Sequence, residues 1–112
     1  MAIKLGEYSF VGPLSSIDKL KDKPGVYAVV CKADTEYFLL DVGESSKLRT
    51  RVENHEKKEC WIKNCNGQLQ IFVHYTTFLK QLGRIQIEQQ LRELFHPTCK
   101  MDSRIWYPEV RF

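Results

Sequence analysis

Apolar residues in this chain gather in short runs separated by polar segments that often contain glycine or proline. Three of these runs, residues 25–31, 37–42 and 69–75, are mostly apolar and rich in β-branched and aromatic side chains. Runs of this length and composition, bounded by turn residues, are typical of buried strands. Only the polar segment 32–36 separates the first two runs, and this short connection predicts an antiparallel hairpin.

Two other segments carry apolar residues at helical spacing. Leu48 and Val52 lie four positions apart and follow Ser45 and Ser46, either of which can cap a helix, so a helix is expected over about 47–59. A second pattern stops before a proline and predicts a helix over about 83–95. Its apolar members are Ile87, Leu91, Leu94 and Phe95. A shorter helical candidate covers residues 17–20.

The order of these elements predicts an α+β fold with a small three-stranded antiparallel sheet flanked by helices. The 112 residues show no internal repeat, so residues 1–112 are expected to form a single domain. The longest apolar run, residues 26–31, is far too short to span a membrane, and Lys4 and Glu7 interrupt any signal-like start. A cytoplasmic protein is therefore expected, with its four cysteines as free thiols.

The net charge is +3, which permits binding to a polyanion without requiring it. The most informative stretch is residues 41–51, where a glycine turn feeds the start of a predicted helix and so points free backbone N–H groups outward. Lys47, Arg51 and His55 follow one another at spacings of four residues and could meet a phosphate together. The alternative is a solvated helix face on which Arg49 and its basic neighbours alternate with glutamates.

Several of these residues together resemble the GIY-YIG nuclease domain over residues 24 to about 100. Gly25-Val26-Tyr27 matches its first strand motif and Val42-Gly43 the end of its second, and an arginine and a glutamate follow at fitting distances, Arg51 and Glu88. Further matches are Pro24, Leu48, His55 and Pro97. The resemblance implies a compact α+β domain that cleaves phosphodiester bonds with one divalent metal ion, normally Mg²⁺ or Mn²⁺.

The resemblance also assigns roles to single residues. Glu88 is the expected metal ligand, Arg51 the catalytic arginine that steadies the phosphate, and Tyr27 the residue that prepares the attacking water. His55 could donate to the phosphate. Each has a structural alternative: Glu88 an ion pair within its helix, Tyr27 a place in the core, and His55 the capping of helix carbonyls.

Three positions depart from the family pattern. Asp41 replaces the tyrosine of the second motif, Glu44 a lysine that often follows the glycine, and Lys100 an asparagine near the end of the chain. Asp41 could act as a base or as a second metal ligand, or it could mark a domain that has lost its chemistry. Asp41 and Glu44 also bring negative charge to a site that must accept a phosphodiester.

Two functions therefore stand: a metal-dependent endonuclease acting on DNA, and a catalytically degenerate module that binds nucleic acid or a protein partner without cleaving. In both, Lys47, Arg49, Arg51 and Lys100 are the candidate nucleic-acid-binding residues. The modest net charge predicts weak, salt-dependent DNA binding. A protein partner could direct the domain to its DNA target. A zinc site built from histidine and cysteine side chains between His55 and Cys99 is a less favoured alternative, because it lacks two closely spaced cysteine pairs.

Overall fold

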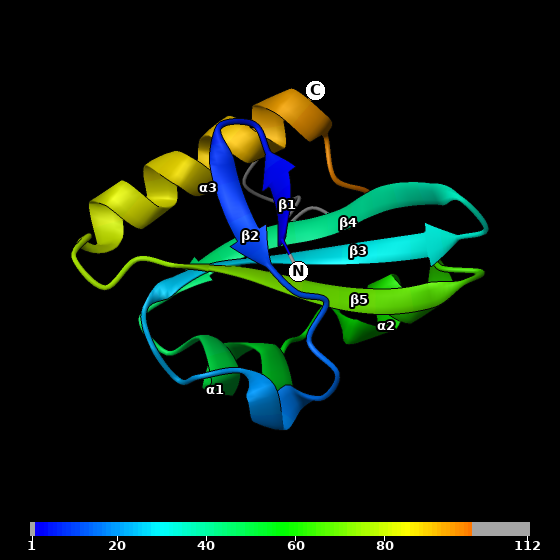
Figure 1. Ribbon diagram of the computed structural model, residues 1–112, viewed down its shortest axis with the longest axis horizontal. Coiled ribbons are helices and arrows are strands. Elements are labelled where there is room, and N and C mark those ends of the chain that lie inside the picture. Colours follow the sequence, from blue (N-terminus) through cyan, green and yellow to red (C-terminus); the bar gives the residue numbers. More distant parts are fainter. Residues whose placement is uncertain (1, 100–112) are drawn as a thin grey trace.

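The computed structural model describes residues 2–99 and shows a sheet with helices on both faces (Figure 1). Within these residues the elements, in chain order, are β1 (Ala2–Leu5), β2 (Tyr8–Val11), the 3₁₀ helix η1 (Ile17–Lys19), β3 (Gly25–Ala33), β4 (Glu36–Ser45), α1 (Leu48–Glu53), α2 (Lys58–Lys63), β5 (Gln68–Tyr75) and α3 (Gln81–Phe95). None of these helices is long and apolar enough to traverse a lipid bilayer.

The described residues form one five-stranded sheet in the order β1-β2-β5-β3-β4, and each pair of neighbouring strands in it is antiparallel. The α+β class is therefore confirmed, whereas the expected count of three strands is wrong. The two additional strands form an N-terminal hairpin, β1 and β2, whose turn uses Gly6 in the left-handed conformation at φ 61°. Glycine adopts this conformation without the steric cost that a Cβ imposes.

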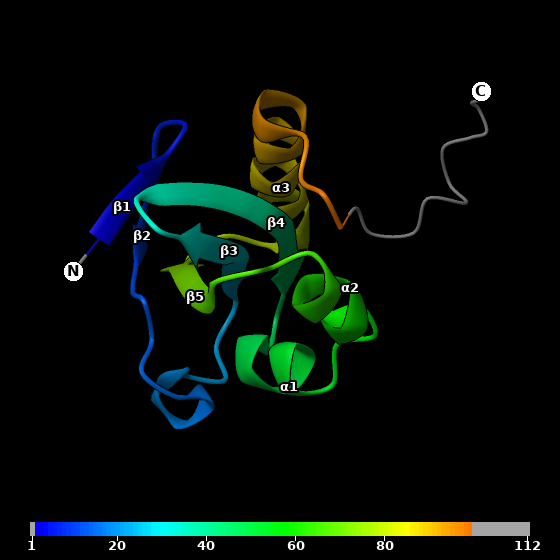
Figure 2. The same ribbon diagram turned by 90° about the vertical axis from the view of Figure 1, so that its right-hand side faces the viewer.

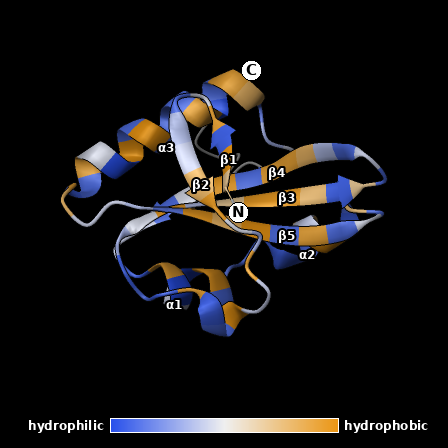
Figure 3. Ribbon diagram, viewed as in Figure 1, coloured by the Kyte–Doolittle hydropathy of each residue, from blue (hydrophilic) through white to orange (hydrophobic). Residues whose placement is uncertain are grey.

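The central strands of the sheet are hydrophobic along much of their length (Figure 3). Figure 2 shows α3 on one side of the sheet and α1 and α2 on the other. The α3 side buries Val26, Ala28 and Phe72 against Ile87 and Leu91 of the helix. Side chains that alternate with these along the strands pack on the other side, where the core members are Tyr27, Val29, Leu40, Leu48, Val52, Trp61 and Val73.

The helix expected over 47–59 is two short helices, because α1 ends at Glu53 and α2 starts at Lys58. Between them the chain turns at residues 54–57, and the N–H of His55 donates to the carbonyl of Val52, a tighter closure than an α-helix makes. Leu48 and Val52 of α1 and Trp61 of α2 pack in the same core cluster, although they lie on separate helices. The break is what places His55 and Glu56 at the edge of the core.

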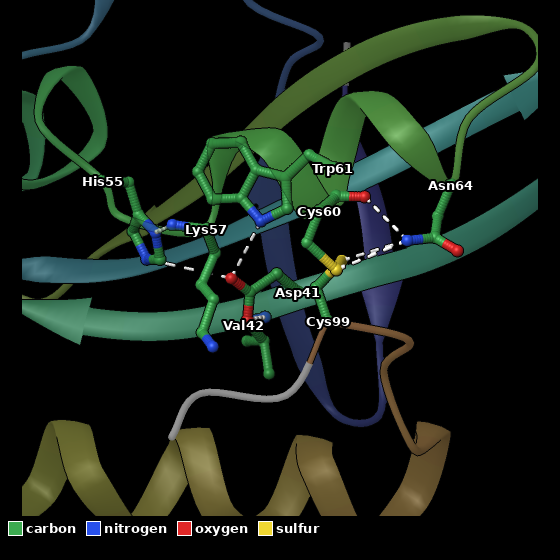
Figure 4. The surroundings of a disulfide bond; sticks show 8 residues. All are labelled: Asp41, Val42, His55, Lys57, Cys60, Trp61, Asn64 and Cys99. Atoms are coloured by element: carbon green, nitrogen blue, oxygen red, sulfur yellow. Dashed lines mark hydrogen bonds and ion pairs between the residues drawn. A yellow bond between two sulfur atoms is a disulfide. The ribbon is translucent and has the colours of Figure 1, made fainter. Parts of the chain in front are cut away.

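The expectation of free thiols is wrong. All four cysteines lie within residues 2–99 and form two disulfides, Cys31–Cys65 and Cys60–Cys99. The first joins β3 to the segment after α2, and the second joins α2 to the segment after α3 (Figure 4). The three cysteines of the alternative zinc set, Cys60, Cys65 and Cys99, are thus all engaged in disulfides.

The outer edge of β4 is covered by the chain that follows α3. The backbone N–H groups of Thr98 and Cys99 donate to the carbonyls of Leu39 and Leu40. Beside them, Nη2 of Arg92 on α3 donates to the carbonyl of Val42 at 2.7 Å. Three segments that are separate in sequence are therefore held together near the Cys60–Cys99 disulfide, namely β4, α2 and residues 98–99.

Candidate active site

Tyr27 stands at the centre of the candidate site and is 1% exposed. On the antiparallel pair β3 and β4 it lies directly opposite Gly43. A Cβ built on Gly43 would overlap the ring and hydroxyl of Tyr27, so only glycine lets the phenol lie across β4. The glycine of the second motif thus has a steric reason within this chain: it makes room for the tyrosine of the first motif.

His55 makes a short hydrogen bond through Nε2 to the hydroxyl of Tyr27, and both side chains are buried. Its other ring nitrogen, Nδ1, accepts the backbone N–H of Lys57 at 3.0 Å. An accepting Nδ1 carries no proton, so the proton of the neutral ring sits on Nε2. His55 therefore donates to the oxygen of Tyr27, and the phenol hydrogen points away from the imidazole.

Burial, followed by the positive charge of Arg51, lowers the pKa of His55 to about 4. The ring is consequently neutral at pH 7, as the tautomer assignment requires. Burial, followed by the negative charge of Asp41, raises the pKa of Tyr27 well above its ordinary value. Tyr27 is thus a neutral phenol in the protein as described, able to offer its hydrogen to a ligand.

Asp41, the residue in place of the second tyrosine, is fully buried beneath α2 (Figure 4). Its Oδ1 accepts the backbone N–H of Val42 and its Oδ2 accepts the indole N–H of Trp61, each at 2.9 Å. Nε2 of His55 is 3.8 Å from Oδ2. Burial raises the pKa of Asp41 to about 6, although the Trp61 hydrogen bond opposes this. With both oxygens engaged, Asp41 braces Trp61 and His55 rather than facing solvent.

Arg51 on α1 forms a two-pronged ion pair with Glu56. Nη1 lies 2.6 Å from Oε2, and Nη2 lies 3.1 Å from Oε1. This pairing lowers the pKa of Glu56 to about 2 and raises that of Arg51. The planar fork of a guanidinium binds a carboxylate and a phosphate in the same way, so Glu56 holds Arg51 in a geometry that a phosphate could take over.

Glu88 approaches from α3, on the opposite face of the sheet, and is 7% exposed. Its Oε2 is buried without a hydrogen-bond partner among the described residues and lies 3.7 Å from Nη2 of Arg92. Burial raises the pKa of Glu88, while Arg92 opposes the rise. The alternative of an ion pair within the helix applies to Arg92 alone, because Arg84 pairs instead with Glu44 at 2.9 Å.

The phenol of Tyr27 connects the two faces of the sheet electrostatically. The positive charge of Arg51 from α1 and the negative charge of Glu88 from α3 both act on its pKa. Arg51 and Glu88 are thus both within electrostatic range of the phenol, to which His55 is hydrogen-bonded. The roles expected of these residues stay predictions.

The expected nucleic-acid-binding residues lie farther out. Lys47 is exposed just before α1, while Nη2 of Arg49 is 3.5 Å from Asp18 and its Nε is 3.8 Å from Glu53. The ion pairs of Arg49 match the solvated-face alternative for that residue. Lys100 lies outside the described residues.

Sequence reasoning missed three side chains that shape the site: Glu56, Trp61 and Arg92. Glu56 was visible only as a helix-face acid, because the break between α1 and α2 was not expected. The structure buries Trp61 with its indole N–H on Asp41. The hydrogen bond of Arg92 to the carbonyl of Val42 on β4 depends on long-range packing.

The residues present fit a divalent cation in one specific way. The buried Oε2 of Glu88 has a positive charge nearby, Nη2 of Arg92 at 3.7 Å, but no hydrogen bond, so a coordinating cation could still compensate its burial. Within the described residues no group of three or more His, Cys, Asp or Glu side chains could hold a metal. Mg²⁺ commonly binds through one or two carboxylates and completes its shell with water and phosphate, so Glu88 alone is a sufficient protein ligand.

Comparison with solved structures identifies the fold. Three structures of the GIY-YIG N-terminal endonuclease domain of UvrC from Thermotoga maritima match this chain, each a point variant bound to its catalytic divalent cation. Each superposes with a TM-score of 0.52 over 80% of this chain and 99% of that domain. Sequence identity is 15% for one and 16% for the other two, so the likeness concerns the fold.

The chain thus has the fold of GIY-YIG endonuclease domains. No family model matches its sequence, and no curated protein matches it either. The residues that resemble the family motifs lie on the elements described above, from β3 to α3.

Proposed function

We propose that this chain is a metal-dependent endonuclease that hydrolyses DNA phosphodiester bonds with one Mg²⁺ or Mn²⁺ ion. The observation that carries the proposal is the buried Oε2 of Glu88, which has no hydrogen-bond partner among the described residues and only a 3.7 Å ion pair with Arg92. The fold shared with nuclease domains supports the same class of chemistry.

Glu88 would hold the cation through its free oxygen. A divalent ion there supplies Lewis acidity and makes a bound water more acidic. The nearby Arg92 donates to the carbonyl of Val42 and lies 3.7 Å from Oε2 of Glu88. It therefore partly neutralises the carboxylate but makes no hydrogen bond to that oxygen. A cation at this position would satisfy the oxygen that the protein leaves without a hydrogen bond.

Arg51 would bind a non-bridging phosphate oxygen and stabilise the charge that develops at phosphorus. Its fork already holds two carboxylate oxygens of Glu56 in a bidentate arrangement. Because Glu56 is largely exposed, its side chain can swing into water when a phosphate arrives. Binding of DNA therefore replaces one anion with another at the same guanidinium.

Tyr27 would orient the attacking water. His55 donates its Nε2 proton to the phenol oxygen, which fixes the phenol and leaves its own hydrogen for the ligand. Asp41 and Trp61 hold His55 from below, since the carboxylate lies 3.8 Å from Nε2 and accepts the indole N–H. In this arrangement Asp41 is a positioning residue for Tyr27 rather than the base itself.

A nicking assay on supercoiled plasmid with Mg²⁺ or Mn²⁺ tests the proposal. The unmodified protein is expected to nick, and Glu88→Gln to lower the rate at least a hundredfold, the order of magnitude of losing a metal ligand. Glu93→Gln, an exposed position on the same helix, is the matched control and should keep full activity. Isothermal titration with Mn²⁺ should show binding to the unmodified protein and not to Glu88→Gln.

The second candidate, a module that binds without cleaving, is favoured by one observation: Glu56 occupies the fork of the expected catalytic arginine. If that pair is permanent, Lys47 and its basic neighbours would bind DNA weakly and in a salt-dependent manner, and a protein partner could supply further affinity. DNA binding by the intact protein with no nicking under either metal would favour this candidate.

A further inference from the structure

A tight turn at the start of α3 presents a single aromatic side chain to solvent. The N–H of Leu79 donates to the carbonyl of Thr76 at 3.0 Å, so Thr77 and Phe78 are the two central residues of the turn. Phe78 is 97% exposed, more than any other large hydrophobic residue in the described part of the chain. Leu79 and Leu82, close in sequence, are also exposed, at 42% and 68%, and a cluster of exposed apolar side chains marks an interaction site.

The turn is fixed at both ends, so Phe78 is held rather than carried on a loose loop. The N–H of Thr76 donates to the carbonyl of Pro24 at 3.0 Å, beside the start of β3. On the other side, Nη1 of Arg84 donates to the carbonyl of Leu79 at 3.2 Å. Nε of the same arginine binds Glu44, the residue after Gly43, at 2.9 Å. Figure 1 shows this turn at the same end of the sheet as the start of β3 and the end of β4.

Three lysines lie near the turn along the backbone. Lys80 follows Phe78 by two residues, and Lys23 precedes the proline that anchors the turn. The carbonyl of Lys23 accepts the N–H of Leu48, which brings in Lys47 as well. All three lysines are exposed, and within residues 2–99 none has an ion-pair partner. An exposed ring among cations matches a strand with a charged backbone and flat, apolar bases.

We propose that Phe78 stacks on an unpaired nucleobase of DNA while Lys23, Lys47 and Lys80 contact the flanking phosphates. This inference rests on the proposed function and narrows its substrate class to DNA with an unpaired or extruded base near the scissile bond. A base inside a regular duplex is already stacked on its neighbours and offers no free face. The aromatic turn therefore selects distorted DNA, and the lysines add affinity that does not depend on structure.

Binding of two labelled DNAs tests the proposal by fluorescence anisotropy, with Ca²⁺ added to avoid cleavage. One is a fully paired 20-mer, and the other carries a three-nucleotide single-stranded gap. The protein should bind the gapped DNA more tightly than the paired DNA. Phe78→Ala should weaken binding to the gapped DNA about tenfold, the usual effect of losing one base–aromatic stack, and leave the affinity for the paired DNA unchanged. Phe78→Trp should keep the preference. Phe38→Ala, at an exposed aromatic on β4, is the control.

Salt dependence separates stacking from charge. Phe78→Ala should leave the slope of log Kd against log salt unchanged, whereas Lys80→Ala should reduce the slope by about one and weaken both DNAs alike. The proposal is overturned if Phe78→Ala binds both DNAs like the unmodified protein, if Phe38→Ala has the same effect, or if neither DNA binds. A Phe78-dependent preference without any nicking would support this inference while refuting the nuclease, and nicking without that preference would do the reverse.

Discussion

Removing either disulfide should cost a large part of this domain's stability. The bridges join cysteines 34 and 39 positions apart in sequence. Closing loops of that length in the unfolded chain is worth about 4 kcal/mol for each bridge. Domains of this size are stable by only about 5–15 kcal/mol, so one bridge represents a substantial share and two a majority.

The perturbation is a pair of double variants, Cys31→Ser with Cys65→Ser, and Cys60→Ser with Cys99→Ser. Urea unfolding followed by tryptophan fluorescence should show a loss of about 4 kcal/mol for each, with the slope raised because the unfolded chain is less constrained. The second pair should lose slightly more, since its bridge closes the longer loop and tethers the segment whose backbone N–H at residue 99 donates to the carbonyl of Leu40. Trp61 reports this region directly.

Thiol titration decides whether the bridges form at all. Protein purified without reductant and unfolded in guanidinium should react with no thiol reagent, and after reduction it should react with four equivalents. Four reactive thiols before reduction would refute the reasoning, as would identical unfolding midpoints for the oxidised and reduced protein.

Three further predictions concern the site. Acidification from pH 6 to 4 should stabilise the fold through Asp41, whose pKa is raised to about 6 in the folded protein, and destabilise it through His55, whose pKa is lowered to about 4. The urea midpoint of Asp41→Asn should therefore fall with acid more steeply than that of the unmodified protein. Equal slopes for the two proteins would contradict this prediction. Glu56→Gln should tighten DNA binding up to about fivefold in anisotropy titrations by removing a carboxylate that competes with phosphate for Arg51, and unchanged affinity would argue against that exchange. Gly43→Ala should cost about 1–3 kcal/mol in urea unfolding because its Cβ overlaps the phenol of Tyr27, whereas Gly83→Ala, whose Cβ meets only ordinary contacts, should be neutral or stabilising.

The central strands and the last helix were predictable because their signals are local. Residues 25–31, 37–42 and 69–75 all lie within observed strands, and the helix expected over 83–95 is α3. The N-terminal hairpin carried a signal of the same kind, alternating apolar residues around Gly6, and was overlooked. These elements follow from side-chain pattern and backbone preference alone.

The helix break and the cysteine pairing depended on tertiary structure. No glycine or proline lies between Val52 and Trp61, which favours a continuous helix, and the weaker stop signal there, Asn54, is the residue that caps α1. The disulfides join elements far apart in sequence, and four cysteines alone do not reveal which ones pair. A bulge between Val29 and Val30, which aims Asp41 beneath α2, is likewise invisible in the sequence.

For the site, the motif resemblance identified residues but not their partners. Tyr27, His55 and Asp41 come from three elements, and only packing brings them together. The pairing of Arg51 with Glu56 depends on the turn between α1 and α2. Sequence reasoning therefore supplied candidate chemistry, while the hydrogen bonds that orient each group required coordinates.

The covering of β4 by residues 98–99 and Arg92 bears on self-association. A bare outer strand can template the strand of a neighbouring copy, and here three of the carbonyls that a neighbour would need are already engaged. At the opposite border of the sheet, β1 is only four residues long and carries the exposed Lys4. Pairing of a neighbouring copy along β4, the strand that carries Asp41 and Gly43, is therefore blocked, and the short, charged β1 is a poor template as well.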